Sequence, residues 1–287
     1  MAIIKNGFTR GTIGHTSYSE RNGVQIVKGL SEKPKYNKTT GTINSSTVFG
    51  KASTLANYFR ISMYDVYNGL HDGGMSVRLT GLVNQCFRPA LDETNLNFNF
   101  KPNTFERLIG FNFNIISPFE KYMFSQPLVE YTSDNRVHIS IAEMNLPRDF
   151  IFPSMISKCK IVLTCGLFDL ENGFYTDQQS QLFDIGKNNP TTIIPEKSAA
   201  FHTQPGCLCM MGISLQYYKT TFAGDIITNN KQFNPSAILS AQITDGMVDR
   251  SVTKKWNKMD FKVGRQLTLP PPAPAQLLLG SPNYTAI

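Results

Sequence analysis

The 287-residue sequence has no apolar run that approaches the roughly 18 residues of a membrane-spanning helix. Charged residues make up only 17% of it and hydrophobic residues 41%, which disfavours a charge-driven disordered chain. The N-terminus lacks the apolar core and the cleavage site of a secretory signal. We therefore expect a chain made in the cytoplasm, without a membrane span, that folds into one large or two ordinary domains.

Sequence motifs of catalysis are also missing. The chain has no G-x-S-x-G turn, no Walker loop, no H-E-x-x-H and no G-x-G-x-x-G. Its five cysteines include no C-x-x-C pair and its four histidines have no ligand spacing, which favours buried thiols over a zinc site or a disulfide framework. The sequence predicts a protein that is not an enzyme and uses no cofactor or metal.

Positive charge is present but unevenly placed. Residues 1–50 and residues 250–265 each have a net charge of +5, while the rest of the chain has −3. Basic segments near both ends suit contacts with nucleic acid or an acidic neighbour, although dispersed basic residues also keep flexible ends soluble. Trp256, among lysines, fits stacking on a base or, more commonly, an apolar peg. The predicted basic contact residues are Arg10, Arg21, Lys28, Lys33, Lys35, Lys254, Lys255 and Lys258.

Residues 1–45 are rich in glycine and small polar residues that separate short apolar islands. This pattern does not fit a helix and predicts an extended basic arm with one or two short strands. Such an arm buries little by itself, so it must lie on its own body, on a neighbouring subunit or on nucleic acid. The predicted assembly residues of this arm are Ile3, Ile4, Val24, Ile26 and Val27.

Residues 46–90 have helical periodicity. Val48, Ala52, Leu55 and Phe59 fall on one helix face, with Ser45 or Ser46 as the cap, and the pattern stops at residues 71–74. A second apolar stripe runs from Met75 to Cys86 and ends before a proline. We expect a helical hairpin here, although the second segment also fits a strand.

Residues 91–249 change to a period of two, with turn residues between the apolar runs. Expected strands include 96–100, 109–115, 137–141, 159–165, 207–218 and 238–243. Clean alternation with one wet face is typical of antiparallel sheets. The fold class is therefore mainly β, an antiparallel β-sandwich or open barrel body with an N-terminal helical hairpin and extended arms at both ends.

Residues 250–287 combine the second basic segment with a proline-rich tail. The tail is expected to be extended, and it closes on Leu277, Leu278 and Leu279. Such a tail fits an anchor in a neighbour's groove or a segment packed on its own domain.

The opening of the chain resembles a Bacteroidota protein family of unknown function. Residues 1–7 (M-A-I-I-K-N-G), the glycines that follow, the run Gly23 to Val27 and a helix ending in Phe59-Arg60 carry this resemblance over about the first 90 residues. Residues 18–20 and the proline-rich tail depart from the family pattern. The resemblance implies a β-rich body and transfers no site residues.

These observations favour a structural subunit of a self-assembling particle, such as a phage virion shell or an extracellular filament. Its expected partners are copies of itself, other structural subunits and, through the basic arms, nucleic acid. The predicted location is the virion or the extracellular assembly. The alternative is a monomeric β-sandwich module that binds a glycan or protein through Tyr217, Tyr218 and loop residues.

Overall fold

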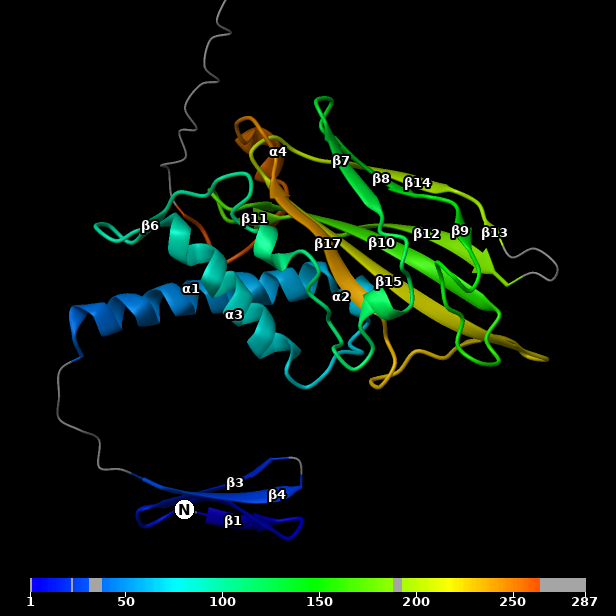
Figure 1. Cartoon of the computed structure of the whole chain (residues 1–287). Coiled ribbons are helices and arrows are strands. Elements are labelled where there is room, and N and C mark those ends of the chain that lie inside the picture. Colours follow the sequence, from blue (N-terminus) through cyan, green and yellow to red (C-terminus); the bar gives the residue numbers. More distant parts are fainter. Residues whose placement is uncertain (1, 22, 31–37, 188–192, 264–287) are drawn as a thin grey trace, which may run out of the picture. The chain divides into compact units, whose positions relative to one another are not determined.

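The computed structural model describes residues 2–21, 23–30, 38–187 and 193–263 (Figure 1). The chain divides into two units, residues 1–44 and residues 45–287. The predicted tail leucines Leu277, Leu278 and Leu279, and the predicted contacts Lys33 and Lys35, lie outside the described residues.

The first unit holds a four-stranded antiparallel sheet, where the sequence predicted one or two strands in an extended arm. Positive φ angles at Asn6 (+53°) and Gly7 (+79°), and again at Gly14 and Gly23, turn the chain at short intervals. Glycine adopts this conformation at no steric cost, so the dispersed glycines mark hairpin turns. The strands, in order across the sheet, are β1 (Ala2–Lys5), β2 (Phe8–Ile13), β3 (Thr16–Arg21) and β4 (Val24–Gly29).

Helices occur in both segments where the sequence predicted them. The longest is α1 (Thr40–Ser62), followed by the single turn α2 (Tyr64–Tyr67) and by α3 (Met75–Phe87). Helix α1 begins before the predicted caps Ser45 and Ser46, because the Thr39 hydroxyl accepts a hydrogen bond from Thr42 N–H at 3.2 Å, as an N-cap does. The predicted apolar stripes are buried in both helices, and the strand alternative for residues 75–86 is wrong. Three 3₁₀ turns follow: η1 (Arg88–Ala90), η2 (Glu106–Leu108) and η3 (Phe119–Lys121).

The body is mainly β, and all its strand pairs are antiparallel, as predicted. Two long strands, β10 (Lys158–Asp169) and β15 (Leu208–Thr221), form the middle of a seven-stranded sheet. A smaller sheet has the order β14-β8-β7. The other strands of the large sheet are β11 (Phe174–Tyr175), β12 (Gln179–Gly186), β16 (Gly224–Ile227), β17 (Ser236–Ile243) and β18 (Asn257–Lys258); the small sheet holds β7 (Leu128–Thr132), β8 (Arg136–Ile141) and β14 (Lys197–His202); two short pairs join β5 (Leu91–Asp92) to β6 (Asn97–Phe98) and β9 (Met144–Asn145) to β13 (Ile193–Ile194).

Residues 161–169 of β10 and 208–215 of β15 are buried on both faces of the sheet, which the expected one-sided alternation does not allow. Odd-numbered residues such as Ile161 and Ile213 share a core with the small sheet, whereas even-numbered Phe168 and Met210 share a core with the helices. Figure 1 shows β10 and β15 between these two layers. Two hydrogen bonds of 2.8 Å also connect the edges of the two sheets, one between the hydroxyls of Tyr131 and Ser240 and one from Gln181 Nε2 to Ala200 O.

The predicted strands at 96–100 and 109–115 are largely wrong. The first is reduced to the two residues of β6, and the second to a bridge between Asn112 and Ala237. Alternation persists because these loops insert aromatic rings into the helix-side core, where Phe98 and Phe100 stack with ring centroids 5.4 Å apart. A buried loop and a short strand therefore have the same apolar pattern in sequence.

The segment 250–263 belongs to the body. It forms α4 (Arg250–Thr253) and β18, and it buries Met259, Phe261 and Val263 in the helix-side core. Trp256 packs against the core between the sheets, in agreement with the peg interpretation. No helix among the described residues is long and apolar enough to cross a membrane.

Candidate assembly surface

The N-terminal sheet exposes aliphatic side chains on both faces. Pairing places Ala2, Gly11, Tyr18 and Val27 in one row across the four strands. Side chains alternate along a strand, so Ile4 and Val27 lie on one face and Ile3 and Val24 on the other. Their exposed fractions are 78% for Ile4, 55% for Val27, 61% for Ile3 and 62% for Val24. Predicted Ile26 is half-buried.

Polar side chains hold this sheet together. Gln25 spans to β2, accepting from Thr9 N–H at 2.8 Å and donating to Thr9 O at 3.0 Å. Arg10, a predicted basic contact, is paired with Glu20 at 2.6 Å. A hydrogen bond from Gly23 N–H and the neighbouring Arg10 lower the pKa of Glu20. Arg10 is therefore paired within its own sheet, and Arg10, Arg21 and Lys28 are all exposed.

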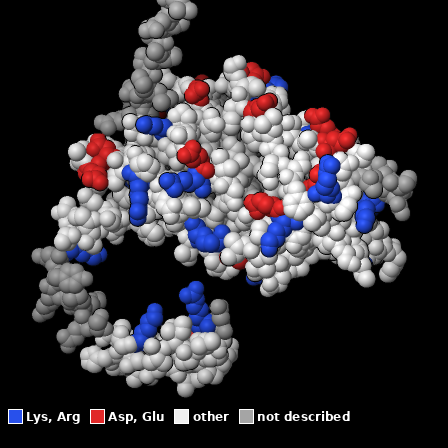
Figure 2. All heavy atoms as spheres, in the orientation of Figure 1, with Lys and Arg blue, Asp and Glu red and all other residues white. Residues whose placement is uncertain are grey.

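The second basic group belongs to the second unit of the chain. Lys254, Lys255 and Lys258 are exposed on the C-terminal segment of the body. Figure 2 shows Lys and Arg interspersed with Asp and Glu on the visible face of the body, which does not form one basic patch. The predicted basic residues that the structure describes are thus divided between the two units of the chain.

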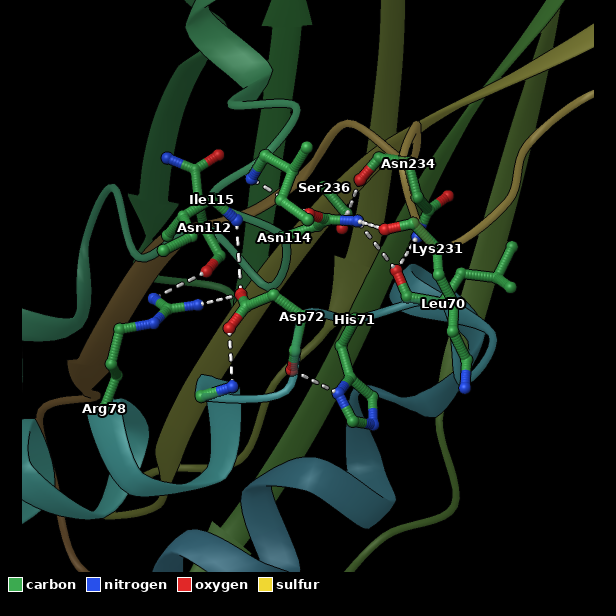
Figure 3. A network of polar contacts seen from close by, with 12 residues as sticks. Leu70, His71, Asp72, Arg78, Asn112, Asn114, Ile115, Lys231, Asn234 and Ser236 are labelled. Carbon is green, nitrogen blue, oxygen red and sulfur yellow. Dashed lines mark hydrogen bonds and ion pairs between the residues drawn. The ribbon is translucent and has the colours of Figure 1, made fainter. Parts of the chain in front are cut away.

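A polar network joins the α2–α3 connection to two loops of the body (Figure 3). Asp72 accepts hydrogen bonds from Gly74 N–H at 2.8 Å and Ile115 N–H at 3.2 Å, and it pairs with Arg78. Arg78 also donates to Asn112 O at 3.1 Å. Burial opposes ionisation of Asp72, but these hydrogen bonds outweigh it and lower its pKa.

Two asparagines extend the same network. Asn234 donates to Tyr67 O and Leu70 O at 3.0 and 3.1 Å, and Asn114 donates to Lys231 O at 2.9 Å (Figure 3). Buried carbonyls at helix ends need such partners. The network thus fixes loops and helix ends, and its carboxylate is already occupied by three donors.

The cysteines lie in the apolar interior. All five are buried free thiols, and the nearest described pair, Cys165 and Cys209, has sulfur atoms 3.7 Å apart. Burial raises the pKa of Cys86 to about 11. No group of three or more potential metal ligands occurs among the described residues.

The two tyrosines of the binding-module alternative have different environments. Tyr217 is fully buried and donates to Ile151 O at 2.8 Å, so its predicted role at a surface is wrong. Tyr218 borders a hollow on the large sheet together with Lys158, Lys160, Asp184 and Asp225. Sequence analysis missed these four charged residues, although the even-numbered positions of β10 and β12 would have placed three of them on one face.

Comparison of the chain with models of known families, with curated proteins and with solved structures finds no match.

Proposed function

We propose that this protein is a structural subunit of a self-assembling particle, a phage virion shell or an extracellular filament, stitched together by its N-terminal sheet. The observation that carries the proposal is the exposure of aliphatic side chains on both faces of that sheet. Copies of the same chain are the main partners, and other structural subunits and nucleic acid are further ones.

The two apolar faces of the N-terminal sheet favour a second copy of the chain as its binding partner. A sheet of four strands needs another layer on each apolar face to keep it from water. Whatever layer covers one face of such a sheet, a second layer is needed to cover the opposite face. The other face then needs a second molecule, and a copy of the same chain is always present at the same concentration.

The energetics are sufficient for a repeated contact. Full burial of one Val or Ile side chain contributes about 1.5–3 kcal/mol. One face offers the exposed side chains of Ile4, Ile13 and Val27 and the other those of Ile3 and Val24. The edge strands β1 and β4 also offer their backbone groups. Residues 1–50 have a charge of +5 and the chain between the basic segments has −3, so attraction between copies adds to the apolar contact.

Sedimentation velocity tests the proposal. The wild-type chain is expected to sediment as a species larger than its 32.1 kDa mass. One variant carries Ile4→Lys with Val27→Lys, and a second carries Ile3→Lys with Val24→Lys, so each places two charges on one face. At least one of them is expected to sediment as a monomer.

The matched control is Val77→Lys with Met247→Lys, at body positions that are 77% and 85% exposed. It adds the same charge and is expected to assemble like the wild type. A wild-type chain that sediments at 32.1 kDa at all concentrations refutes assembly. If both face variants assemble normally, the sheet is not the contact.

A further inference from the structure

A hollow of about 390 Å³ opens on the large sheet, near the ends of β10, β12 and β15. Pairing puts Lys158 between Gly186 and Tyr218, and Lys160 between Asp184 and Gln216. These even-numbered positions share the face of the sheet on which Gly166 and Gly212 meet the helices. The hollow therefore lies on the helix-side face, where side chains of the strands and of Asp225 form its walls.

The charges of the hollow balance. Lys158 Nζ is 2.8 Å from Asp225 Oδ2, and Lys160 Nζ is 3.8 Å from Asp184 Oδ1. Thr220 also donates to Asp225 at 2.8 Å, which fixes that carboxylate. A phosphate or another anion attracted by the lysines is repelled by the aspartates. A ligand without charge avoids this conflict and still meets both donors and acceptors.

An aromatic ring completes the wall. The Tyr218 hydroxyl donates to Gln216 Oε1 at 3.0 Å, and Lys160 Nζ lies 5.5 Å from the centre of the Tyr218 ring. The face of an aromatic ring is electronegative and attracts polarised C–H groups as it attracts a cation. A sugar ring combines such a C–H face with hydroxyls at its rim, which match the carboxylates and ammonium groups around Tyr218.

We propose that this hollow binds an uncharged carbohydrate of one or two sugar rings, with the Tyr218 ring as one wall and Asp184, Asp225 and the lysines on its hydroxyls. The volume fits the lower part of the range of about 300–1,000 Å³ typical of small-molecule sites. This proposal is independent of assembly, since it rests on the body and not on the N-terminal sheet.

Saturation-transfer NMR tests the proposal on the full chain, because it reads ligand signals whatever the size of the protein particle. The probes are maltose, cellobiose and lactose, with inorganic phosphate and a sulfated heparin disaccharide as charged comparisons. At least one neutral disaccharide is expected to receive saturation, with a Kd in the range of about 1 mM. Both charged probes are expected to bind more weakly.

The variants assign the binding to the hollow. Tyr218→Ala is expected to weaken it by about tenfold, and Tyr218→Phe, which keeps the ring, by less. Asp184→Ala changes a side chain that is 84% exposed, so it tests the site without disturbing the fold. Tyr64→Ala, at a 51% exposed tyrosine outside the hollow, is the matched control and is expected to bind like the wild type.

Three results overturn the proposal. One is the absence of saturation transfer to every neutral disaccharide. Another is unchanged binding in both Tyr218→Ala and Asp184→Ala. The third is tighter binding of phosphate or of the heparin disaccharide, which assigns the lysines to an anion.

Discussion

Gly166 is the position where a single methyl group tests the packing of the helices on the large sheet. A Cβ added to Gly166 collides with Ser62 Oγ and lies 3.2 Å from Met63 Cε. Ser62 is buried at the end of α1, and its hydroxyl has no hydrogen-bond partner among the described residues. The end of the helix sits directly on the strand because glycine leaves room for it.

Gly166→Ala is therefore expected to destabilise the body. Overpacking of a filled core costs about 1–3 kcal/mol. Replacing a strand glycine returns about 0.5–1 kcal/mol of backbone entropy, so the net loss is roughly 1–2 kcal/mol. For a body of this size, a loss of that order lowers the melting temperature by about 2–8 °C.

Two companion variants make the result decisive in urea titrations. Ser62→Ala removes the colliding hydroxyl, leaving the nearest contacts of the new Cβ at 3.2 Å, so the double variant is expected to recover most of the loss. Gly81→Ala, in α3 with open space around its Cβ, is expected to stabilise by about 0.5–1 kcal/mol. If Gly166→Ala is as stable as Gly81→Ala, or if Ser62→Ala gives no recovery, the close contact is not what stabilises this interface.

Two further predictions concern ionisable groups. The pKa of Asp72 is lowered in the folded chain, so its contribution to the free energy of unfolding is present above the ordinary value of 3.8 and is lost as the pH falls below it. Urea titrations from pH 6 to pH 3 are expected to show that loss in the wild type. The free energy of unfolding of Asp72→Asn is expected to be roughly 1–3 kcal/mol lower at pH 6 and to change less with pH. If the free energies of the two proteins change in parallel with pH, the proposed role of the Asp72 network is wrong. The five buried thiols are expected to react with a thiol reagent only in denaturant, since burial raises the pKa of Cys86 to about 11, and fast reaction of the native chain contradicts their burial.

Local periodicity predicted the elements whose partners are near in sequence. The stripe of Val48, Leu55 and Phe59 forms a buried helix face, and the alternation around Ile139 belongs to a strand with one solvent-exposed face. Local periodicity failed to predict the structure where the surroundings of a residue are formed by residues far away in sequence. Leu167 and Phe168 are both buried, because the small sheet covers one face of β10 and the helices cover the other. Adjacent apolar residues in a strand do not reveal which layers will cover them.

The candidate sites differ in the same way. The assembly residues Ile3 and Ile4 were predicted from composition, since an apolar pair in a polar, glycine-rich segment lacks local partners. The hollow was not predicted from the sequence, because Lys158, Asp184 and Tyr218 come together only through the register of the strands. Asp72 and Asn234 join loops that are far apart in sequence, and no spacing signals that contact.

The packing of the segment 250–263 bears on which terminal segment could cross to a neighbouring copy. The net charge of +5 over residues 250–265 suggested a second basic arm, but Thr253, Met259, Phe261 and Val263 are buried while Lys254, Lys255 and Lys258 are exposed. Main-chain bonds from Met259 N–H to Gly173 O and from Val263 N–H to Leu170 O, each at 2.9 Å, tie it to the body. A segment that fills a core is not free to cross to a neighbour without unfolding that core. Within the described residues, we therefore assign the proposed crossing between copies to the N-terminal sheet, whose apolar side chains are exposed on both faces.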